Sequence, residues 1–165
     1  MTPERFDEFY RASVARLTGQ LYSLTGDITE AQDVVQDAFV KAWQHRAALD
    51  SARSPEAWVR TAAWRTAISR FRRIKTGSRA WSRVEVRNAE PPAEPTDPAL
   101  VAALKALPEE QRYAVVMFHL VDLSVQEIAD EVGCPVGTIK ARLSRGRAAL
   151  AASVSNTALA EDHHG

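Results

Sequence analysis

The chain has 165 residues, of which 45% are hydrophobic and 25% charged, and its formal net charge is zero. This composition is typical of a globular protein of one or two small domains, and neither an apolar run of membrane-spanning length nor a signal-peptide core is present, so we expect a cytoplasmic protein. The single cysteine, Cys134, excludes an internal disulfide and is expected to have a small packing role in a turn.

The charges are unevenly distributed along the chain, although they cancel overall. Ten Lys or Arg and only two acidic residues lie in residues 53–87, whereas residues 90–131 hold nine acidic and two basic residues. A basic block of this kind can lie along nucleic-acid phosphates. The net charge of zero therefore does not exclude a nucleic-acid partner.

Helical periodicity predicts two helices in residues 1–45. The first helix, or a broken pair, ends at Thr25-Gly26. The second begins after Asp27, whose spacing to Glu30 fits a capping box, and reaches about His45. The expected buried stripes are Phe6, Phe9, Tyr10, Leu17, Leu21 and Leu24 in the first helix, and Ile28, Ala31, Val35, Ala38, Phe39 and Ala42 in the second.

The other face of the second helix carries a polar, partly acidic strip. An exposed strip of this composition can be recognised by a partner protein. Its members are Asp33, Gln36, Asp37, Val40 and Gln44.

A third helix is predicted to begin at Ser54-Pro55 and to run to about Lys75, because serine is a good helix cap and proline fits a first turn. Two apolar stripes are expected, Trp58, Val59 and Ala62 on one side and Trp64, Ile68 and Phe71 on the other, with Arg60, Arg65, Arg70, Arg72 and Arg73 between them. Trp64 either packs in the core or belongs to an aromatic and cationic surface that would stack unpaired bases.

Four prolines in residues 88–98 predict an extended linker, residues 86–98. This linker would separate a domain of residues 1–85 from a domain of residues 99–152, with a disordered tail at residues 153–165. No strand-like alternation of useful length occurs on either side. The predicted fold class is all-α, with two small helical domains.

Residues 124–150 have the pattern of a helix-turn-helix. The spacing of Ser124 and Glu127 fits a capping box, Gly133 can end the first helix in a left-handed conformation, and Pro135 can precede a second helix. The first helix would bury Ile128, Ala129 and Val132. The second would bury Ile139, Leu143, Gly146 and Leu150.

The opposite face of this second helix has the composition of a DNA-reading surface. Lys140 and Arg145 could bond base edges, while Ala141 and Ser144 would let the helix approach the major groove closely. Arg142 and Arg147 flank that face and are expected to meet phosphates. An amphipathic hairpin with solvated arginines is the alternative, but it explains neither the turn chemistry nor the absence of acidic residues in 134–160.

Enzymatic and cofactor sites are not indicated. His45, His119, His163 and His164 share no metal-ligand spacing with Cys134, and no glycine-rich phosphate loop occurs. His119 beside Phe118 is expected to pack. We therefore expect no catalytic residue, cofactor, metal or small-molecule substrate, and the rival function is a stand-alone helix-turn-helix regulator of the repressor or response-regulator type.

Three segments together resemble the extracytoplasmic-function (ECF) group of sigma-70 RNA polymerase sigma factors. They are DVVQDAFVKAW, SPEAWVRTAAWRTAISRFRR and LPEEQRYAVVMFHLVDLSVQEIADEVGCPVGTIKARLSRGR, and the resemblance extends from Phe6 to Leu150. It implies a non-catalytic promoter-recognition subunit with a region 2 helical bundle and a region 4 helix-turn-helix. An anti-sigma factor is a further partner that the resemblance allows.

The resemblance also implies roles for particular residues. Asp33, Gln36 and Asp37 would contact the clamp helices of the largest subunit of core RNA polymerase. A loop at residues 47–54 and the next helix would capture a flipped base of the −10 element, with Arg53, Arg60, Trp64 and Arg65 as candidates. The helix at residues 136–151 would bind the −35 element of promoter DNA, and Glu90, Glu94 and Asp97 of the linker would imitate nucleic acid. Many members have an Arg-Asn pair and an Asp where this chain has Trp64-Arg65 and Ser69.

Overall fold

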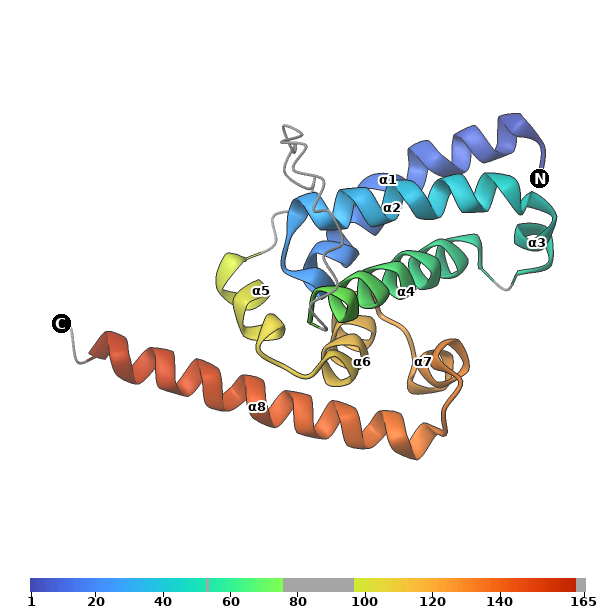
Figure 1. Ribbon diagram of the computed structural model, residues 1–165. Helices are drawn as coiled ribbons and strands as arrows, with labels where there is room; N and C mark the ends of the chain where they lie inside the picture. Colours follow the sequence, from blue (N-terminus) through green and yellow to red (C-terminus); the bar gives the residue numbers. More distant parts are fainter. Residues whose placement is uncertain (53, 76–96, 163–165) are drawn as a thin grey trace. The chain divides into compact units, whose positions relative to one another are not determined.

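The computed structural model describes the backbone of residues 1–52, 54–75 and 97–162, and side chains as far as Ser155. Every regular element in these ranges is an α-helix (Figure 1). The chain divides into two compact units, residues 1–96 and residues 97–165. The all-α fold class predicted from the sequence is confirmed.

The described part of the first unit consists of the helices α1 (Pro3–Thr25), α2 (Ile28–Gln44), α3 (Arg46–Ser51) and α4 (Pro55–Lys75). Helices α1, α2 and α4 pack against one another in all three pairings. Leucines of α1 and valines of α2 and α4 fill the space between them. The largest fully buried side chains of this core are Leu17, Leu21, Leu24, Val34, Val35, Leu49 and Val59.

Local signals set the boundary between α1 and α2. α1 ends at Gly26, which has a φ of 72° in the left-handed region, where an L side chain would be strained. The Asp27 side chain accepts a hydrogen bond from the Glu30 N–H, as predicted. The Asp27 N–H donates instead to the Thr25 hydroxyl at 3.3 Å. Asp27 therefore caps α2, but its own N–H bonds to Thr25. In a complete capping box it would bond to the Glu30 carboxylate.

The segment before α4 is more ordered than predicted. We expected a loop at residues 47–54, but α3 occupies most of it and buries Leu49. Arg53 lies outside the described residues. α4 then begins at Pro55, where the Ser54 hydroxyl accepts from the Ala57 N–H at 3.3 Å, and it ends at Lys75 as predicted.

The buried face of α4 runs between the two predicted apolar stripes. The four buried residues of α4 are Val59, Arg60, Ala63 and Ala67. Small residues at this face bring α4 close to α1 and α2, and the larger apolar side chains are displaced to its flanks. Of the residues in the two predicted apolar stripes, Val59 is fully buried, Trp58, Ala62, Trp64 and Ile68 are half-buried, and Phe71 is exposed.

The second unit contains α5 (Pro98–Lys105), α6 (Glu109–His119), α7 (Val125–Val132) and α8 (Val136–Asp162). α8 packs against α5, α6 and α7. Asp97 caps α5 by accepting from the Ala99 N–H at 2.9 Å, so this carboxylate of the predicted linker belongs to a helix terminus. The rest of the predicted linker, including Glu90 and Glu94, lies outside the described residues.

Helix α8 is longer than predicted. We expected a helix of residues 136–151 followed by a disordered tail, but α8 continues to Asp162. Residues 148–160 are rich in Ala and contain neither Gly nor Pro, so nothing in their sequence ends the helix. The tail histidines His163 and His164 lie outside the described residues.

Two features are absent from the described residues. None of the helices is both long and apolar enough to cross a membrane. No group of three or more His, Cys, Asp or Glu side chains in the described ranges could hold a metal ion.

Candidate nucleic-acid and partner interfaces

The turn between α7 and α8 is built by local chemistry. A complete capping box starts α7: the Ser124 hydroxyl accepts from the Glu127 N–H and the Glu127 carboxylate accepts from the Ser124 N–H, each at 3.1 Å. α7 ends at Gly133, which has a φ of 76°. Pro135 directly precedes α8. The predicted helix-turn-helix geometry is confirmed.

The inward face of α8 is close to the predicted one. Ile139, Leu143 and Gly146 are buried, and Leu150 is half-buried. At Gly146 an added Cβ would lie 2.7 Å from Val115 Cγ2, so glycine permits a close approach of α8 to α6. Val132 of α7 was predicted to be buried but is 41% exposed, because it lies in the last turn of α7 beside the Gly133 turn.

The outward face of α8 carries two cationic and two small side chains. Lys140, Ala141, Ser144 and Arg145 are all exposed, as predicted. The two small residues lie between the two cations along this face. The backbone of α8 can therefore approach a groove while cationic side chains reach its base edges.

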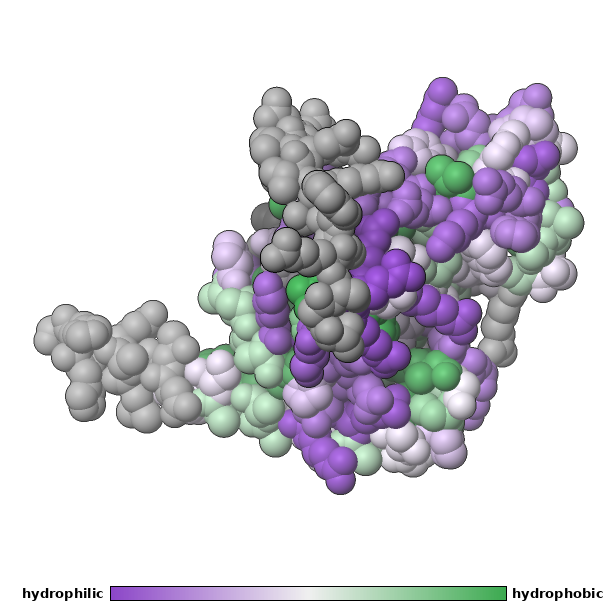
Figure 2. Space-filling view, viewed as in Figure 1, coloured by the Kyte–Doolittle hydropathy of each residue, from purple (hydrophilic) through white to green (hydrophobic). Residues whose placement is uncertain are grey.

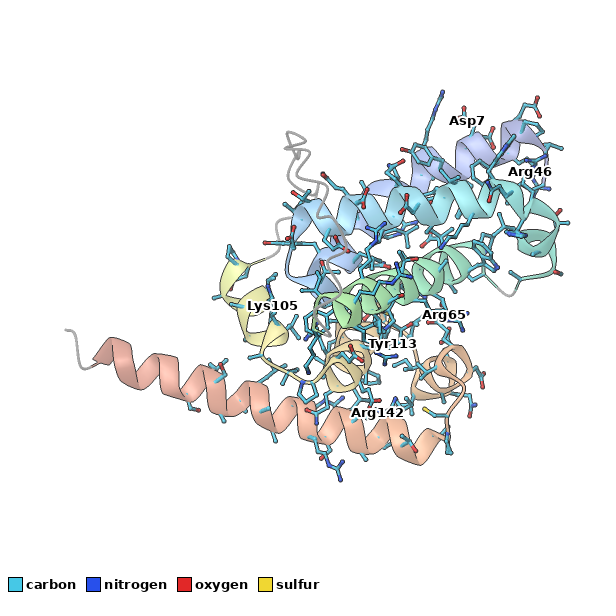
Figure 3. The ribbon with its side chains drawn as sticks, viewed as in Figure 1. Asp7, Arg46, Arg65, Lys105, Tyr113 and Arg142 are labelled. Carbon is cyan, nitrogen blue, oxygen red and sulfur yellow. The ribbon has the colours of Figure 1, made fainter. Side chains whose placement is uncertain are left out.

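Contacts with α6 hold the two flanking arginines of α8. Arg142, labelled in Figure 3, lies 3.7 Å from a Glu110 carboxylate oxygen, and its guanidinium also contacts Cys134 Sγ at 4.0 Å. The Arg147 Nε donates to His119 Nε2 at 2.9 Å, and its guanidinium lies 5.1 Å from the centroid of the Phe118 ring. Both arginines are thus oriented before any ligand binds.

His119 has a more specific role than the packing we expected. Its ring makes an edge contact with Phe118, with the ring centroids 5.0 Å apart. It also accepts the hydrogen bond from Arg147. Only a tertiary contact between α6 and α8 creates this pairing, so sequence reasoning missed it.

The acidic strip of α2 is less free than predicted, because its side chains bond to neighbouring helices. Arg70 of α4 forms ion pairs with Asp33 and, at 2.6 Å, with Asp37. Gln36 donates to the Tyr10 hydroxyl of α1 at 3.0 Å. These three α2 residues are half-buried, which corrects our expectation of a fully exposed strip, whereas Val40 and Gln44 are exposed.

Electrostatics reflect this crowding. Burial is the largest influence on Glu30 and raises the pKa of its carboxyl, the negative charges of Asp33 and Asp27 raise it further, and Arg70 lowers it. Burial lowers the pKa of Arg70, but the hydrogen bond and charge of Asp33, with the charges of Glu30 and Asp37, outweigh it and leave the pKa above its usual value. Three carboxylates, those of Glu30, Asp33 and Asp37, thus surround the single guanidinium of Arg70 that neutralises them.

The candidate −10 residues on α4 separate into different environments. Arg60 is only 3% exposed, and its Nη1 lies 3.4 Å from the Gln20 amide oxygen. Its assignment to a DNA-contacting surface is therefore wrong, because position 60 lies on the same buried face as Val59 and Ala63. Arg65 is exposed, and Figure 3 shows it extending from α4. Trp64 is half-buried.

Two hollows lie along the exposed side of α4. One, of about 290 Å³, is lined by residues of the α3–α4 connection and the first turns of α4, including Ser54, Trp58, Thr61 and Arg65. The sequence analysis placed Trp58 on an apolar stripe without a functional role and did not select Thr61. An aromatic ring beside a hydroxyl and a guanidinium can stack and hydrogen-bond a planar base.

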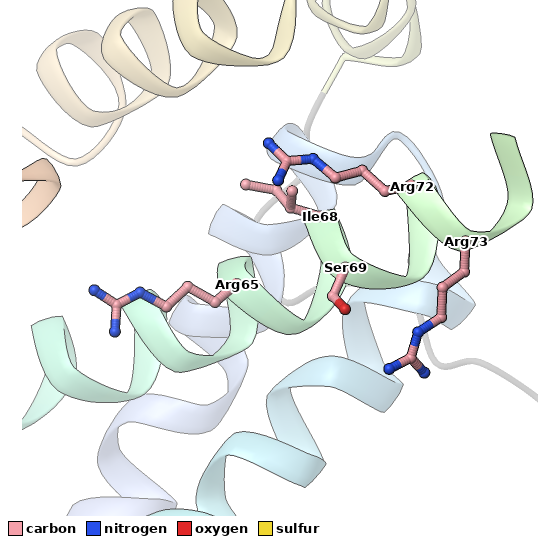
Figure 4. A pocket seen from close by; sticks show the side chains of 5 residues that line it. All are labelled: Arg65, Ile68, Ser69, Arg72 and Arg73. Atoms are coloured by element: carbon pink, nitrogen blue, oxygen red, sulfur yellow. The ribbon is translucent and has the colours of Figure 1, made fainter. Parts of the chain in front are cut away.

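The second hollow, of about 460 Å³, is lined by Arg65, Ile68, Ser69, Arg72 and Arg73. Figure 4 shows the three guanidiniums pointing in different directions instead of converging on one point. This arrangement suits an extended polyanion better than a single phosphate. Hydrophilic side chains also cover much of the visible surface of the first unit (Figure 2). We did not predict Arg72 and Arg73 as DNA-binding residues. Two consecutive arginines at the end of α4 are a signal in the sequence that could have identified them.

Comparison with known families matches both units in chain order. Residues 9–76 match the family model described as sigma-70 region 2, and residues 98–150 match the one described as sigma-70, region 4. The first range includes α2 and α4, and the second includes the helix-turn-helix.

Curated relatives agree with these matches. The ECF RNA polymerase sigma factor SigL of Mycobacterium tuberculosis is 33% identical over 127 residues, which are 73% of this chain and 72% of the relative. The ECF RNA polymerase sigma factor SigW of Bacillus subtilis is 28% identical over 145 residues, which are 78% of each chain.

Two solved structures are similar to the whole fold. The sigma factor RpoE in complex with the anti-sigma factor NepR from Bartonella quintana has a TM-score of 0.74 and 25% identity, and the match covers 92% of this chain and 98% of that one. CnrH in complex with the cytosolic domain of CnrY has a TM-score of 0.66 and 26% identity, with 94% and 90% covered.

Proposed function

The chain belongs to the ECF RNA polymerase sigma factors and is an alternative sigma factor for transcription initiation, and we propose that it binds core RNA polymerase and directs it to promoters by reading their −35 and −10 elements. The observation that carries this proposal is the exposed face of α8, which combines cationic and small side chains in a complete helix-turn-helix. In this role the protein carries no catalytic residue and works in the cytoplasm.

In our proposal α8 reads the −35 element. Lys140 and Arg145 contact base edges, and Ala141 and Ser144 allow the approach. Arg142 and Arg147 bind phosphates on either side. Their contacts with Glu110, His119 and Phe118 support this assignment, because a guanidinium that is already oriented loses less conformational entropy on binding.

The exposed side of α4 is our proposed reader of the −10 element. The hollow beside Trp58, Thr61 and Arg65 has room for a flipped nucleobase, and stacking would offset part of the cost of unstacking it. Arg72 and Arg73 extend the cationic surface toward the C-terminal end of α4 and would follow the strand's phosphates. Arg53 and Trp64 remain candidates for the same role.

Core polymerase binding is assigned to α2. Asp33, Gln36 and Asp37 present polar groups, and the exposed Val40 and Gln44 continue the same face. A mixed surface of this kind suits the clamp helices of the largest polymerase subunit. An anti-sigma factor is a further proposed partner, since both similar structures are described as complexes with such a protein or with the cytosolic domain of another chain.

The direct test is transcription by reconstituted holoenzyme. The purified protein is mixed with core RNA polymerase and a pool of random promoters, and the transcribed templates are sequenced. We expect a stable complex and enrichment of one paired −35 and −10 sequence. Failure to associate with core would refute the proposal, and tight sequence-specific duplex binding by the free protein would favour a stand-alone regulator.

A further inference from the structure

One ion-pair cluster connects the proposed polymerase-binding helix to the proposed −10 helix. Arg70 projects from α4 and forms ion pairs with three carboxylates of α2: Asp33 through Nη1, Asp37 through Nη2 at 2.6 Å, and Glu30 at 3.6 Å. The two nitrogens of one planar guanidinium thus bind two aspartates one turn apart. A fork of this geometry fixes orientation as well as charge.

The α2 carboxylates would repel one another without this guanidinium. Glu30 and Asp33 are three residues apart and Asp33 and Asp37 are four apart, so all three lie on the same side of the helix. With the carboxylates ionised, the cluster still carries two more negative than positive charges. Burial is the main cause of the raised pKa of Glu30, Arg70 opposes it, and the charge of Asp33 adds to it.

Stability alone is a weak reason for such a cluster. The side chains of Arg70 and Asp37 are 31% and 42% exposed, and ion pairs at such positions contribute little to the free energy of unfolding. The first unit also contains an analogous bridge elsewhere, in which Arg16 of α1 binds both carboxylate oxygens of Glu56 on α4. The Arg70 cluster is distinguished by its location on the proposed polymerase-binding strip.

We infer that Arg70 is a positioning residue for polymerase binding, which holds the Asp33 and Asp37 carboxylates in the orientation that a cationic or amide donor of the polymerase recognises. This inference rests on the proposed function of α2. The Asp37 side chain is 42% exposed and so remains accessible to the incoming donor while Nη2 binds its carboxylate. Orientation before binding lowers the entropic cost of forming the complex.

The test measures affinity for core RNA polymerase by titration of a fluorescently labelled full chain. Arg70→Ala should weaken binding about tenfold. A change of this size is within the range found for residues that affect binding without touching the ligand. Arg70→Lys should be intermediate, because an ammonium cannot bridge two carboxylates as a fork does. Arg16→Ala is the matched control, since it also breaks an interhelical ion pair to α4, and it should bind core as the wild type does.

A double-mutant cycle separates positioning from a general effect on folding. Arg70→Ala should weaken binding distinctly less in the Asp37→Asn background than in the wild type, because its action passes through that carboxylate. Equal losses in both backgrounds would overturn the inference. Circular dichroism and thermal melting of each variant check that the fold is retained, and Arg70→Lys provides the test if Arg70→Ala unfolds.

The outcomes distinguish this inference from the proposal beneath it. If Asp37→Asn weakens core binding and neither Arg70 variant does, the positioning role is refuted and the function of α2 stands. If the wild type does not bind core, or Asp33→Asn and Asp37→Asn both bind as the wild type does, the polymerase-binding assignment of α2 fails and the inference fails with it.

Discussion

Helices α4 and α8 are both rich in arginine, yet their arginines have different environments. On α4, Arg60 is buried and Arg70 is bound to α2, while Arg65 remains exposed. On α8, Arg145 is exposed on the outward face, and Arg147 contacts a histidine and an aromatic ring at the edge of that face. The number of cations on a helix therefore does not define its nucleic-acid surface.

Packing explains the difference. α4 contacts both α1 and α2, so that two of its sides are covered, while Arg65, Arg72 and Arg73 lie along an open hollow. The first half of α8 buries Ile139, Leu143 and Gly146 and half-buries Arg142, whereas Lys140, Ala141, Ser144 and Arg145 remain exposed on its outward face. A helix that leaves one whole face uncovered keeps the side chains of that face available for DNA.

The largest effect that tests this comparison is expected from charge reversal at Arg60. Arg60→Glu would place a carboxylate at a position only 3% exposed, where the Arg60 guanidinium now lies 3.4 Å from the Gln20 amide oxygen. We expect a loss of about 3 kcal/mol or more in the free energy of unfolding, because an uncompensated buried charge costs several kcal/mol. Urea denaturation followed by circular dichroism measures this loss.

Arg65→Glu is the matched variant on the exposed side of α4. It should change the free energy of unfolding by no more than about 0.5 kcal/mol, as is usual for surface positions, but it should weaken the capture of −10 single strands by holoenzyme. If Arg60→Glu unfolds at the wild-type urea concentration, the division of α4 into a buried and a DNA-facing side is incorrect.

On α8 the corresponding variant is Arg145→Ala. We expect it to cost about 1–3 kcal/mol at the cognate −35 sequence and to relax the preference at the contacted base pair, because the side chain is proposed to contact a base edge. The measurement is holoenzyme binding to a set of promoters that differ at single −35 positions. Arg11→Ala, which removes an exposed arginine of α1, is the control. An unaltered preference would show that the proposed reading face of α8 is assigned wrongly.

The close packing of α8 on α6 depends on Gly146. Gly146→Ala would bring a Cβ to 2.7 Å from Val115 Cγ2, and we expect a destabilisation of about 1–2 kcal/mol. Gly137→Ala on the same helix meets nothing within 4 Å and should stabilise by about 0.5–1 kcal/mol, because alanine is the better helix former. Equal thermal melting shifts in the two variants would contradict the close packing of α8 on α6.

Features with a local chemical cause could be predicted from the sequence. The Ser124–Glu127 box, the Gly133 turn and the Ser54-Pro55 start of α4 each depend on residues within a few positions of one another. The exposed face of α8 could also be predicted, because the helical period places Lys140 and Arg145 opposite the buried stripe.

Features decided by tertiary contacts could not be predicted in the same way. Helical periodicity does not show that small alanines of α4 pack inward beside Arg60, nor that Arg70 reaches the carboxylates of α2. The pairing of His119 with Arg147 joins residues 28 positions apart. In each case the partner lies on another helix, and the spacing along one helix carries no information about it.

The smallest expected effect concerns the acidic surplus that Arg70 leaves on α2. The pKa of Glu30 is raised above 4.5 in the folded protein, mainly by burial, so folding favours its protonated form. The raised pKa of Glu30 therefore stabilises the folded protein fully at pH values below the pKa of Glu30 in the unfolded chain. This stabilisation is lost as the pH rises through the higher pKa of Glu30 in the folded protein.

Glu30→Gln stays neutral at every pH and should avoid that loss. The variant should be slightly more stable than the wild type at pH 7, and the difference should shrink as the pH falls below the ordinary pKa of a glutamate in the unfolded chain. Urea unfolding at both pH values measures it. A variant less stable than the wild type at pH 7 would mean that the ion pair between Glu30 and Arg70 outweighs the cost of burying the carboxylate. The single guanidinium of Arg70 would then stabilise the three ionised carboxylates of α2 more strongly than the ratio of one positive to three negative charges suggests.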